Sequence, residues 1–249
     1  MPGSFAPQSI PLCVFAKPPR PGRAKTRLAA KIGDEAACSL ATAFISDFIA
    51  LASKYPWAYP VLATTEDGLP EDSFPAAAFP VGVSPRSVPR WVQPDGDLGA
   101  KIEGIVRRGL EKAEAVICCG ADSPGRPEER LEMAAQALRD GSDAVLGPTE
   151  DGGYDILALK GCPEGLLAEL PWSQPTTFDA SRRRLEERGL RVAVLERWWD
   201  VDEVEDLERL RTLLATEAGA MRAPATTAAL ARADASATIP GSESPQATG

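Results

Sequence analysis

The chain has 249 residues, of which 44% are hydrophobic, so it can form one substantial core. Its formal net charge of −9 argues against a nucleic-acid binder, because such proteins neutralise phosphates along an extended basic face. A single bound nucleotide remains compatible with this charge, since it needs only one local basic pocket.

Histidine is absent from the sequence. This excludes Ser-His-Asp and Cys-His catalysis, histidine general bases and zinc sites with histidine ligands. A metal ion would have to be held by oxygen atoms, which favours Mg²⁺ or Mn²⁺ as the cofactor.

The five cysteines form no CxxC pair, and three of them lie in apolar runs. This usage is typical of reduced core cysteines and predicts a cytoplasmic protein. No stretch approaches ~18 uninterrupted apolar residues, so we expect neither a membrane span nor a membrane partner.

Short apolar runs alternate with longer stretches of helical periodicity. The expected strands cover residues 12–16, 59–64, 90–93, 115–119, 143–146, 156–159 and 190–195. The expected helices cover residues 34–54, 99–112, 127–139, 177–188 and 203–214. The proline-rich residues 68–89 indicate a loop, with room for a short strand at 79–83. This alternation predicts an α/β fold, a mainly parallel sheet with helices on both faces.

The composition changes after Glu217 to alanine, threonine, serine, proline and glycine, with almost no large apolar residue. Such a segment buries too little surface to offset the entropy lost on ordering. The sequence therefore predicts one domain over residues 1–217 and a disordered tail over residues 218–249.

A basic stretch follows the first expected strand. Between residues 17 and 33 there are six basic residues and no acidic one. Proline and glycine allow a tight loop whose backbone N–H groups face an anion, and the cations add charge-assisted bonds to phosphate oxygens. A solvated basic surface loop is the alternative. We predict a nucleotide-phosphate site made by Lys17, Gly22, Arg23, Lys25, Thr26 and Arg27.

Two acidic segments also follow expected strands, where ligands of open parallel sheets bind. Asp122 comes after the apolar residues 115–119 and could hold Mg²⁺ against a diphosphate, or merely cap the next turn. Asp200 and Asp202 follow the last strand, and in an extended chain their side chains point to the same side. Asp202 is also a candidate N-cap for the last helix. Asp122, Asp200 and Asp202 are therefore candidate metal ligands.

A third acidic segment, residues 150–155, contains two adjacent glycines where a backbone could approach a ligand closely. An ordinary tight turn between strands explains this segment nearly as well. If the acceptor carries a hydroxyl group, Asp151 is the candidate base.

Several of these segments together resemble a known family. Residues 15–28 resemble the signature loop of the radical-SAM/selenodomain-associated transferase family, usually described as glycosyltransferases with the GT-A, or nucleotide-diphospho-sugar transferase, fold. The resemblance continues, in order, through residues 96–99, 120–124, 147–154, 171–173 and 200–202. Residues 24–28 and 200–202 also look like 2-phospholactate guanylyltransferase and the molybdenum-cofactor guanylyltransferases. The resemblance implies phosphates on Arg23, Lys25 and Arg27, and metal on Asp122 and Asp202.

The sequence departs from this pattern at three places. The family more often has cysteine at Ser123, a second tyrosine at Asp155, and Thr-Pro where Glu203 and Val204 stand. These changes concern the acceptor side more than the phosphate side, so the acceptor is the feature that the resemblance specifies least.

Two reactions fit these residues, both with a nucleotide or nucleotide sugar and a small acceptor as partners. In nucleotidyl transfer an acceptor phosphate attacks a nucleoside triphosphate, with Lys25 and Arg27 stabilising the leaving pyrophosphate. In glycosyl transfer the same loop binds the diphosphate of a nucleotide sugar, and Asp151 takes the proton. The strongly basic loop favours nucleotidyl transfer. A nucleotide-binding protein without turnover is a third alternative.

Overall fold

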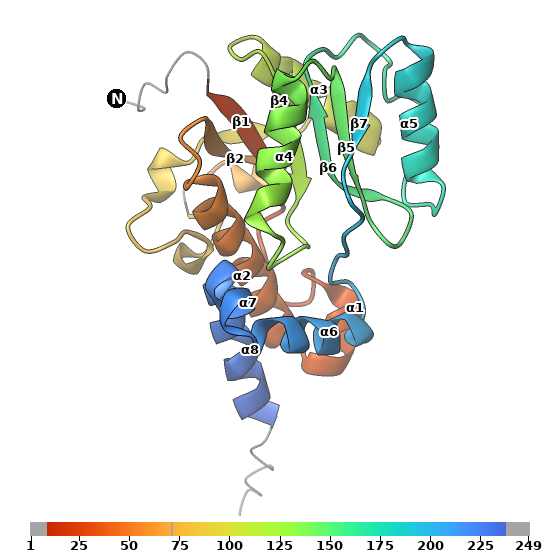
Figure 1. Ribbon diagram of the computed structural model, residues 1–249. Helices are drawn as coiled ribbons and strands as arrows, with labels where there is room; N and C mark the ends of the chain where they lie inside the picture. The colour runs from red at the N-terminus through yellow and green to blue at the C-terminus, as the bar shows by residue number, and fades with distance from the viewer. Residues whose placement is uncertain (1–8, 71, 238–249) are drawn as a thin grey trace, which may run out of the picture.

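The computed structural model describes residues 9–70 and 72–237, and it contains a seven-stranded sheet in the order β3-β2-β1-β4-β6-β5-β7 (Figure 1). Every pairing is parallel except those of β6, which runs antiparallel to β4 and β5. The strands are β1 Ile10–Phe15, β2 Ala58–Thr64, β3 Arg90–Val92, β4 Val116–Gly120, β5 Ala144–Pro148, β6 Tyr154–Leu159 and β7 Val192–Val194. The expected mainly parallel sheet is confirmed.

Helices cover both faces of the sheet. One face packs against α2 (Asp34–Ala52) and α4 (Glu128–Arg139) in one apolar cluster. The other face packs against α3 (Leu98–Leu110) and α5 (Thr177–Glu187) in a second cluster. The central strands β1, β4, β5 and β6 are buried on both faces, which is why they read as continuous apolar runs in the sequence. The expected three-layer α/β fold is confirmed.

The direction of β6 matters for the site. Because β6 runs antiparallel to β4, its first residues lie beside the last residues of β4, and Cys119 is paired with Ile156. Segments that leave β1 and β4 and the segment that enters β6 therefore meet at one edge of the sheet.

Helix α2 is long and apolar enough to cross a membrane by length and composition alone. However, 67% of its apolar window is buried inside the fold. The helix packs on the sheet through Ile45, Phe48 and Ile49, and on other helices through Leu40 and Phe44. We therefore assign α2 as a core helix.

A small helical core lies beyond this edge of the sheet (Figure 1). It is formed by α2 together with α1 (Thr26–Ile32), α6 (Val204–Leu214), α7 (Glu217–Arg222) and α8 (Pro224–Ala237). Leu28, Phe44, Val201 and Leu230 are among its buried residues. Segments from both ends of the chain thus support one another here.

Two local expectations differ from the structure. Part of the basic stretch is helix α1 rather than loop, and Leu28 at its centre is fully buried. No strand forms at residues 79–83 within the described part of the chain; residues 66–89 contain three short 3₁₀ turns, Glu66–Gly68, Ala76–Ala78 and Pro85–Ser87.

The C-terminal segment also differs from the expected disordered tail, because residues 217–222 and 224–237 are helical. Asp47 of α2 is buried and accepts hydrogen bonds from the backbone N–H groups of Ala225 and Thr226, both at 2.9 Å, and from the Thr226 hydroxyl at 2.6 Å. A carboxylate from α2 therefore caps α8, while Ala229 and Leu230 enter the helical core. Residues 238–249 lie outside the described part.

Candidate functional site

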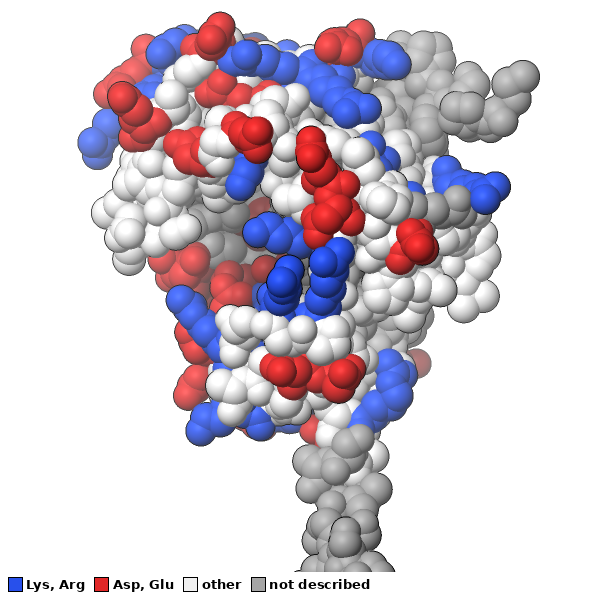
Figure 2. Space-filling model, turned by 180° about the vertical axis from the view of Figure 1, so that it is seen from behind, with Lys and Arg blue, Asp and Glu red and all other residues white. Residues whose placement is uncertain are grey.

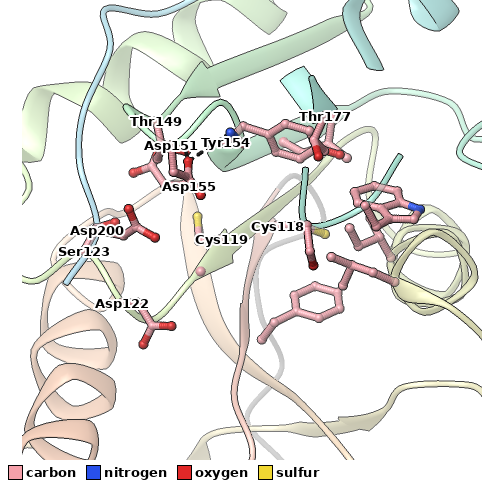
Figure 3. A pocket seen from close by; sticks show the side chains of 18 of the residues that line it. Cys118, Cys119, Asp122, Ser123, Thr149, Asp151, Tyr154, Asp155, Thr177 and Asp200 are labelled. Atoms are coloured by element: carbon pink, nitrogen blue, oxygen red, sulfur yellow. Dashed lines mark hydrogen bonds between the residues drawn. The ribbon is translucent and has the colours of Figure 1, made fainter. Parts of the chain in front are cut away.

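Two adjoining cavities lie at the edge of the sheet described above. The first, the basic half, has a volume of about 690 Å³ and is lined by Lys17, Arg23, Lys25 and Arg27, among others. The second, the acidic half, has a volume of about 290 Å³ and is lined by Asp122, Asp151, Asp155 and Asp200, among others (Figure 3). Both cavities are lined by Phe15, Asp122, Asp151, Ser173 and Gln174. They therefore form one cleft with two chemically different halves.

Lys25 is the central cation of the basic half. Its ammonium donates to the Val201 carbonyl at 2.8 Å and to Asp202 Oδ1 at 2.7 Å, and it lies 2.8 Å from Asp122 Oδ1. Only 9% of the side chain is exposed. Burial alone would lower the pKa of this ammonium, but the carboxylates of Asp122 and Asp202 outweigh it, so the pKa is raised. Lys25 is thus a charged lysine held between two carboxylates.

The backbone of Lys25 has φ 46° and ψ 52°, in the left-handed region that a lysine rarely adopts. It stands at the start of α1, after a turn in which Arg20 accepts from the backbone N–H groups of Arg23 and Ala24. The three contacts of the ammonium hold this conformation in place. Gly22 supplies a φ of 73° within the turn and is absent from the lining of both cavities.

Two local arrangements bring Asp122 and Asp202 together. The backbone N–H of Val201 donates to the Asp122 carbonyl at 2.8 Å, which joins the segment after β7 to the end of β4. Glu203, rather than Asp202, is the N-cap of α6 and forms a capping box with Asp206. The Asp202 carboxylate is therefore left for Lys25.

The other cations of the basic half are solvent-facing. The Arg27 side chain is 69% exposed and lies 3.0 Å from Glu203, while Lys17 and Arg23 are also exposed. Thr26 lines the same cavity. Figure 2 shows lysine and arginine side chains gathered near the centre of one face of the molecule, with acidic side chains around them. A polyanion would meet several exposed cations here beside the buried Lys25.

Asp151 lies where the two halves meet. Its Oδ1 accepts from the Thr149 hydroxyl at 2.6 Å and from the Gly153 backbone N–H at 2.9 Å. These two bonds fix the carboxylate in the turn between β5 and β6, and the side chain lines both cavities. Asp151 is thus a fixed carboxylate at the junction of the two cavities.

Asp200 belongs to the acidic half. Burial, and then the carboxylates of Asp151 and Asp202, raise the pKa of Asp200 to about 7. Asp155, by contrast, is buried against Arg130 at 2.9 Å and Arg126 at 3.5 Å. The Asp155 charge is therefore balanced inside the fold, and Asp151 and Asp200 give the acidic half its character.

A turn over residues 171–177 contributes Ser173 and Gln174 to the lining of both cavities. The Thr177 hydroxyl lies 2.6 Å from the Pro171 carbonyl and 2.7 Å from that of Gln174, which closes the turn. Gly152 packs so tightly here that a Cβ would lie 2.0 Å from the Pro175 carbonyl oxygen. Ser173 has a φ of 58° and lines both cavities. The turn is thus held rigidly against the glycines of the 149–153 segment.

The remaining side of the acidic half is apolar. The Trp172 ring meets the Tyr154 ring edge-on, with centroids 6.2 Å apart. Gly99 of α3 makes room for Trp172, because a Cβ at Gly99 would lie 3.0 Å from its indole nitrogen. Leu98 lines the same side and is 41% exposed. The two aromatic rings and Leu98 therefore form an apolar surface in the same cavity as the carboxylates of Asp151 and Asp200.

Five of the predicted residues, Lys17, Arg23, Lys25, Thr26 and Arg27, line the basic half, together with the predicted ligands Asp122 and Asp202 and the predicted base Asp151. The structure separates Asp200 from Asp202: Asp200 lines the acidic half and Asp202 the basic half. Sequence reasoning missed the apolar wall of Leu98, Tyr154 and Trp172. All three residues stand inside segments of the family resemblance, 96–99, 147–154 and 171–173, which was the available signal.

The carboxylates fit a divalent cation that arrives with phosphate. Asp122 and Asp202 each give Oδ1 to Lys25, and their side chains are 48% and 46% exposed, so the second oxygen of each is available. Over the described residues no group of three or more acidic or cysteine side chains is placed to hold a metal on its own. Magnesium is commonly held by one or two carboxylates plus substrate phosphates.

Comparisons with known proteins bear on the fold. Residues 54–174 match the model of a family described as "Uncharacterized protein conserved in bacteria (DUF2064)". No curated protein matches the sequence. The crystal structure of a presumed nucleotide-diphospho-sugar transferase from Desulfovibrio desulfuricans G20 is 25% identical, with a TM-score of 0.78 over 92% of this chain and 96% of that one.

Two further enzymes, both with cytidine nucleotides in their names, share the fold at lower sequence identity. CMP:2-keto-3-deoxy-manno-octonic acid synthetase, crystallised with CTP, is 15% identical with a TM-score of 0.53, over 83% of this chain and 99% of that one. A 4-diphosphocytidyl-2C-methyl-D-erythritol synthase from Anaerococcus prevotii DSM 20548 is 13% identical with a TM-score of 0.52, over 85% and 98%. The chain has the fold of nucleotide-using transferases, and the closer resemblance to guanylyltransferases stays a prediction.

Proposed function

We propose that the protein is a glycosyltransferase that uses a nucleotide-diphospho-sugar donor and a small hydroxylated acceptor. The observation that carries this proposal is the division of charge in the cleft. Four cationic side chains line the basic half, and none lines the acidic half among the described residues. The diphosphate of the donor suits the first half, and an uncharged sugar and acceptor suit the second.

The basic half would bind the donor diphosphate through Lys25 and Arg27, with Lys17 and Arg23 beside them. Asp122 and Asp202 would hold Mg²⁺ or Mn²⁺, which neutralises charge on the departing diphosphate. Lys25 keeps the two carboxylates in position and adds its own positive charge beside the leaving diphosphate.

Asp151 would act as the base at the junction. In the transfer, an acceptor oxygen forms a bond to the anomeric carbon of the donor sugar, and the bond from that carbon to the diphosphate oxygen breaks. The acceptor proton goes to Asp151, and the nucleoside diphosphate leaves with the bonding electron pair. The contacts from Thr149 and Gly153 occupy one oxygen of Asp151, so the other remains for the proton.

Nucleotidyl transfer is the second candidate, and the number of cations favours it. A triphosphate carries more charge than a diphosphate, and the basic half offers three exposed cations in addition to Lys25. The attacking phosphate would then need a cation on the acceptor side. The acidic half supplies carboxylates instead, so we rank this reaction second, whereas the basic loop considered by itself ranked it first.

The two candidates differ in the bond that breaks. We would incubate the full chain and Mg²⁺ with a panel of nucleotide sugars and of nucleoside triphosphates, and follow release of nucleoside diphosphate and of pyrophosphate. Glycosyl transfer predicts diphosphate release from a nucleotide sugar that also protects the protein thermally. Pyrophosphate release from a triphosphate, with no turnover of any nucleotide sugar, would make nucleotidyl transfer the function.

A further inference from the structure

We infer that the acidic half selects an uncharged acceptor, one that presents a hydroxyl group to Asp151 and an apolar face to Trp172 and Leu98. This rests on the proposed function and adds the chemical class of the acceptor. It also excludes phosphorylated and other anionic acceptors from this cavity.

The charges of the cavity exclude an anion. Asp151 and Asp200 line it without a lysine or arginine among the described lining residues. Arg126 and Arg130 lie near, but both are buried and face Asp155. In Figure 3, Asp122, Asp151 and Asp200 come from three segments that converge on one side of the pocket. A phosphate group here would be repelled at short range by the Asp151 carboxylate, with no cation of the lining to offset it.

The opposite side of the cavity supplies the apolar contact. Phe15, Leu98, Ile102 and Trp172 contribute apolar surface, and Trp172 is held by Tyr154 and by the space at Gly99. Large exposed apolar side chains at the lining of a cavity indicate contact with a ligand more often than isolated ones elsewhere. A sugar ring, alone or with an aromatic aglycone, offers both surfaces that this cavity needs. Its hydroxyl groups can meet Asp151, and its C–H bonds or the aromatic ring can pack on Trp172 and Leu98.

The size of the cavity restricts the acceptor further. A volume of about 290 Å³ lies at the lower end of the range of about 300–1,000 Å³ found for small-molecule pockets. This suits a small organic molecule rather than a folded partner.

The test compares three probes on the full chain by saturation-transfer NMR. Phenyl β-D-glucopyranoside offers hydroxyls and an apolar ring, methyl β-D-glucopyranoside offers hydroxyls alone, and glucose 6-phosphate adds an anion. We expect the phenyl glucoside to bind most tightly and glucose 6-phosphate to bind at least about tenfold more weakly than the phenyl glucoside, the factor that corresponds to about 1.4 kcal/mol. Equal or tighter binding of glucose 6-phosphate, or no binding of either glucoside, overturns the inference.

A charge substitution locates the effect. Leu98 is 41% exposed, so Leu98→Lys adds a cation to the apolar side without disturbing buried packing. We expect it to raise affinity for glucose 6-phosphate about tenfold and to weaken the phenyl glucoside. The matched control Met133→Lys adds the same charge at an exposed apolar residue that lines neither cavity, and it should leave both affinities unchanged. Unchanged probe affinities in Leu98→Lys would show that the probes bind elsewhere and would also overturn the inference.

Calorimetric titration of UDP, GDP and CDP with Mg²⁺ into the same proteins separates this inference from the proposed function. The donor test can fail while the order of the probes holds, which removes the transferase function but leaves the selectivity of the cavity. Tight nucleotide binding together with a preference for glucose 6-phosphate removes the inference alone.

Discussion

The two halves of the cleft are built on different parts of the fold. The acidic half stands on the sheet, where the ends of β4 and β6 and helices α3 and α5 share one apolar cluster. The basic half stands largely on the small helical core of α1, α2, α6 and α8, whose helices come from both ends of the chain. Binding in the basic half should therefore depend on distant helix packing, while binding in the acidic half should depend mainly on the sheet.

Asp122 joins the two halves, so its loss should have the largest effect on turnover. Asp122→Asn removes a candidate metal ligand, and we expect kcat/KM to fall on the order of 10³-fold, as when one group that stabilises transition-state charge is lost. Chelation of the divalent metal should do the same to the wild type. Asp140→Asn, at the end of α4, is the matched control, because Asp140 lines neither cavity. Full activity of Asp122→Asn would remove its assigned role.

Removal of α8 should act mainly on the basic half. A chain that stops at Ala223 loses the burial of Leu230 and Ala229 and leaves Asp47 without its three donors. We expect the free energy of unfolding to fall by about 3 kcal/mol and nucleotide affinity to fall with it. Binding of the phenyl glucoside should change less.

The matched control for this truncation removes only residues 238–249 and keeps α8. Urea unfolding of the two truncated chains measures the difference. Equal stability would mean that α8 contributes nothing, in agreement with the disordered tail that the composition predicts.

Within the basic half, Lys25→Ala should lower both affinity and stability. We expect the binding free energy of a nucleoside diphosphate to weaken by roughly 2 kcal/mol. Stability should fall by about 1–2 kcal/mol, because Asp122 and Asp202 then face each other without a cation; their half-exposed side chains keep this cost below that of a fully buried pair. Lys31→Ala, in the same basic stretch but away from both cavities, is the control. Calorimetry and thermal unfolding measure the two quantities, and unchanged stability would show that the ammonium does not hold the carboxylates.

The sequence predicted the sheet well and the helical core poorly. The strands and α2 to α6 follow from apolar periodicity, since each has an unbroken buried face. Helix α1 was missed because its one fully buried residue, Leu28, stands among cations. Helix α8 was missed because alanine and threonine bury little surface; its position depends on Asp47, 178 residues away from Ala225 along the chain.

The candidate site divides in the same way. The basic residues were predictable because six cations stand together in an acidic protein. Which of them turns inward was not predictable, because the left-handed backbone of Lys25 is held by Asp122, Val201 and Asp202 from distant segments. The apolar wall around Trp172 was missed because Leu98 and Tyr154 come together only through the topology of the sheet.

Arg27→Ala has the smallest expected effect, and it tests whether an exposed cation of the basic half differs from the buried Lys25. The Arg27 side chain is 69% exposed and has one ion pair, with the exposed Glu203, so Arg27→Ala should change the free energy of unfolding by less than ~0.5 kcal/mol. Nucleotide affinity should fall by about 1.5 kcal/mol, since an exposed arginine contributes at the lower end of the range for a hydrogen bond to a charged group. The loss should shrink as salt rises, because solvent ions screen an exposed charge more than the buried Lys25. Titrations at low and high salt measure this, and an equal salt dependence for Arg27→Ala and Lys25→Ala would show that the two cations act alike.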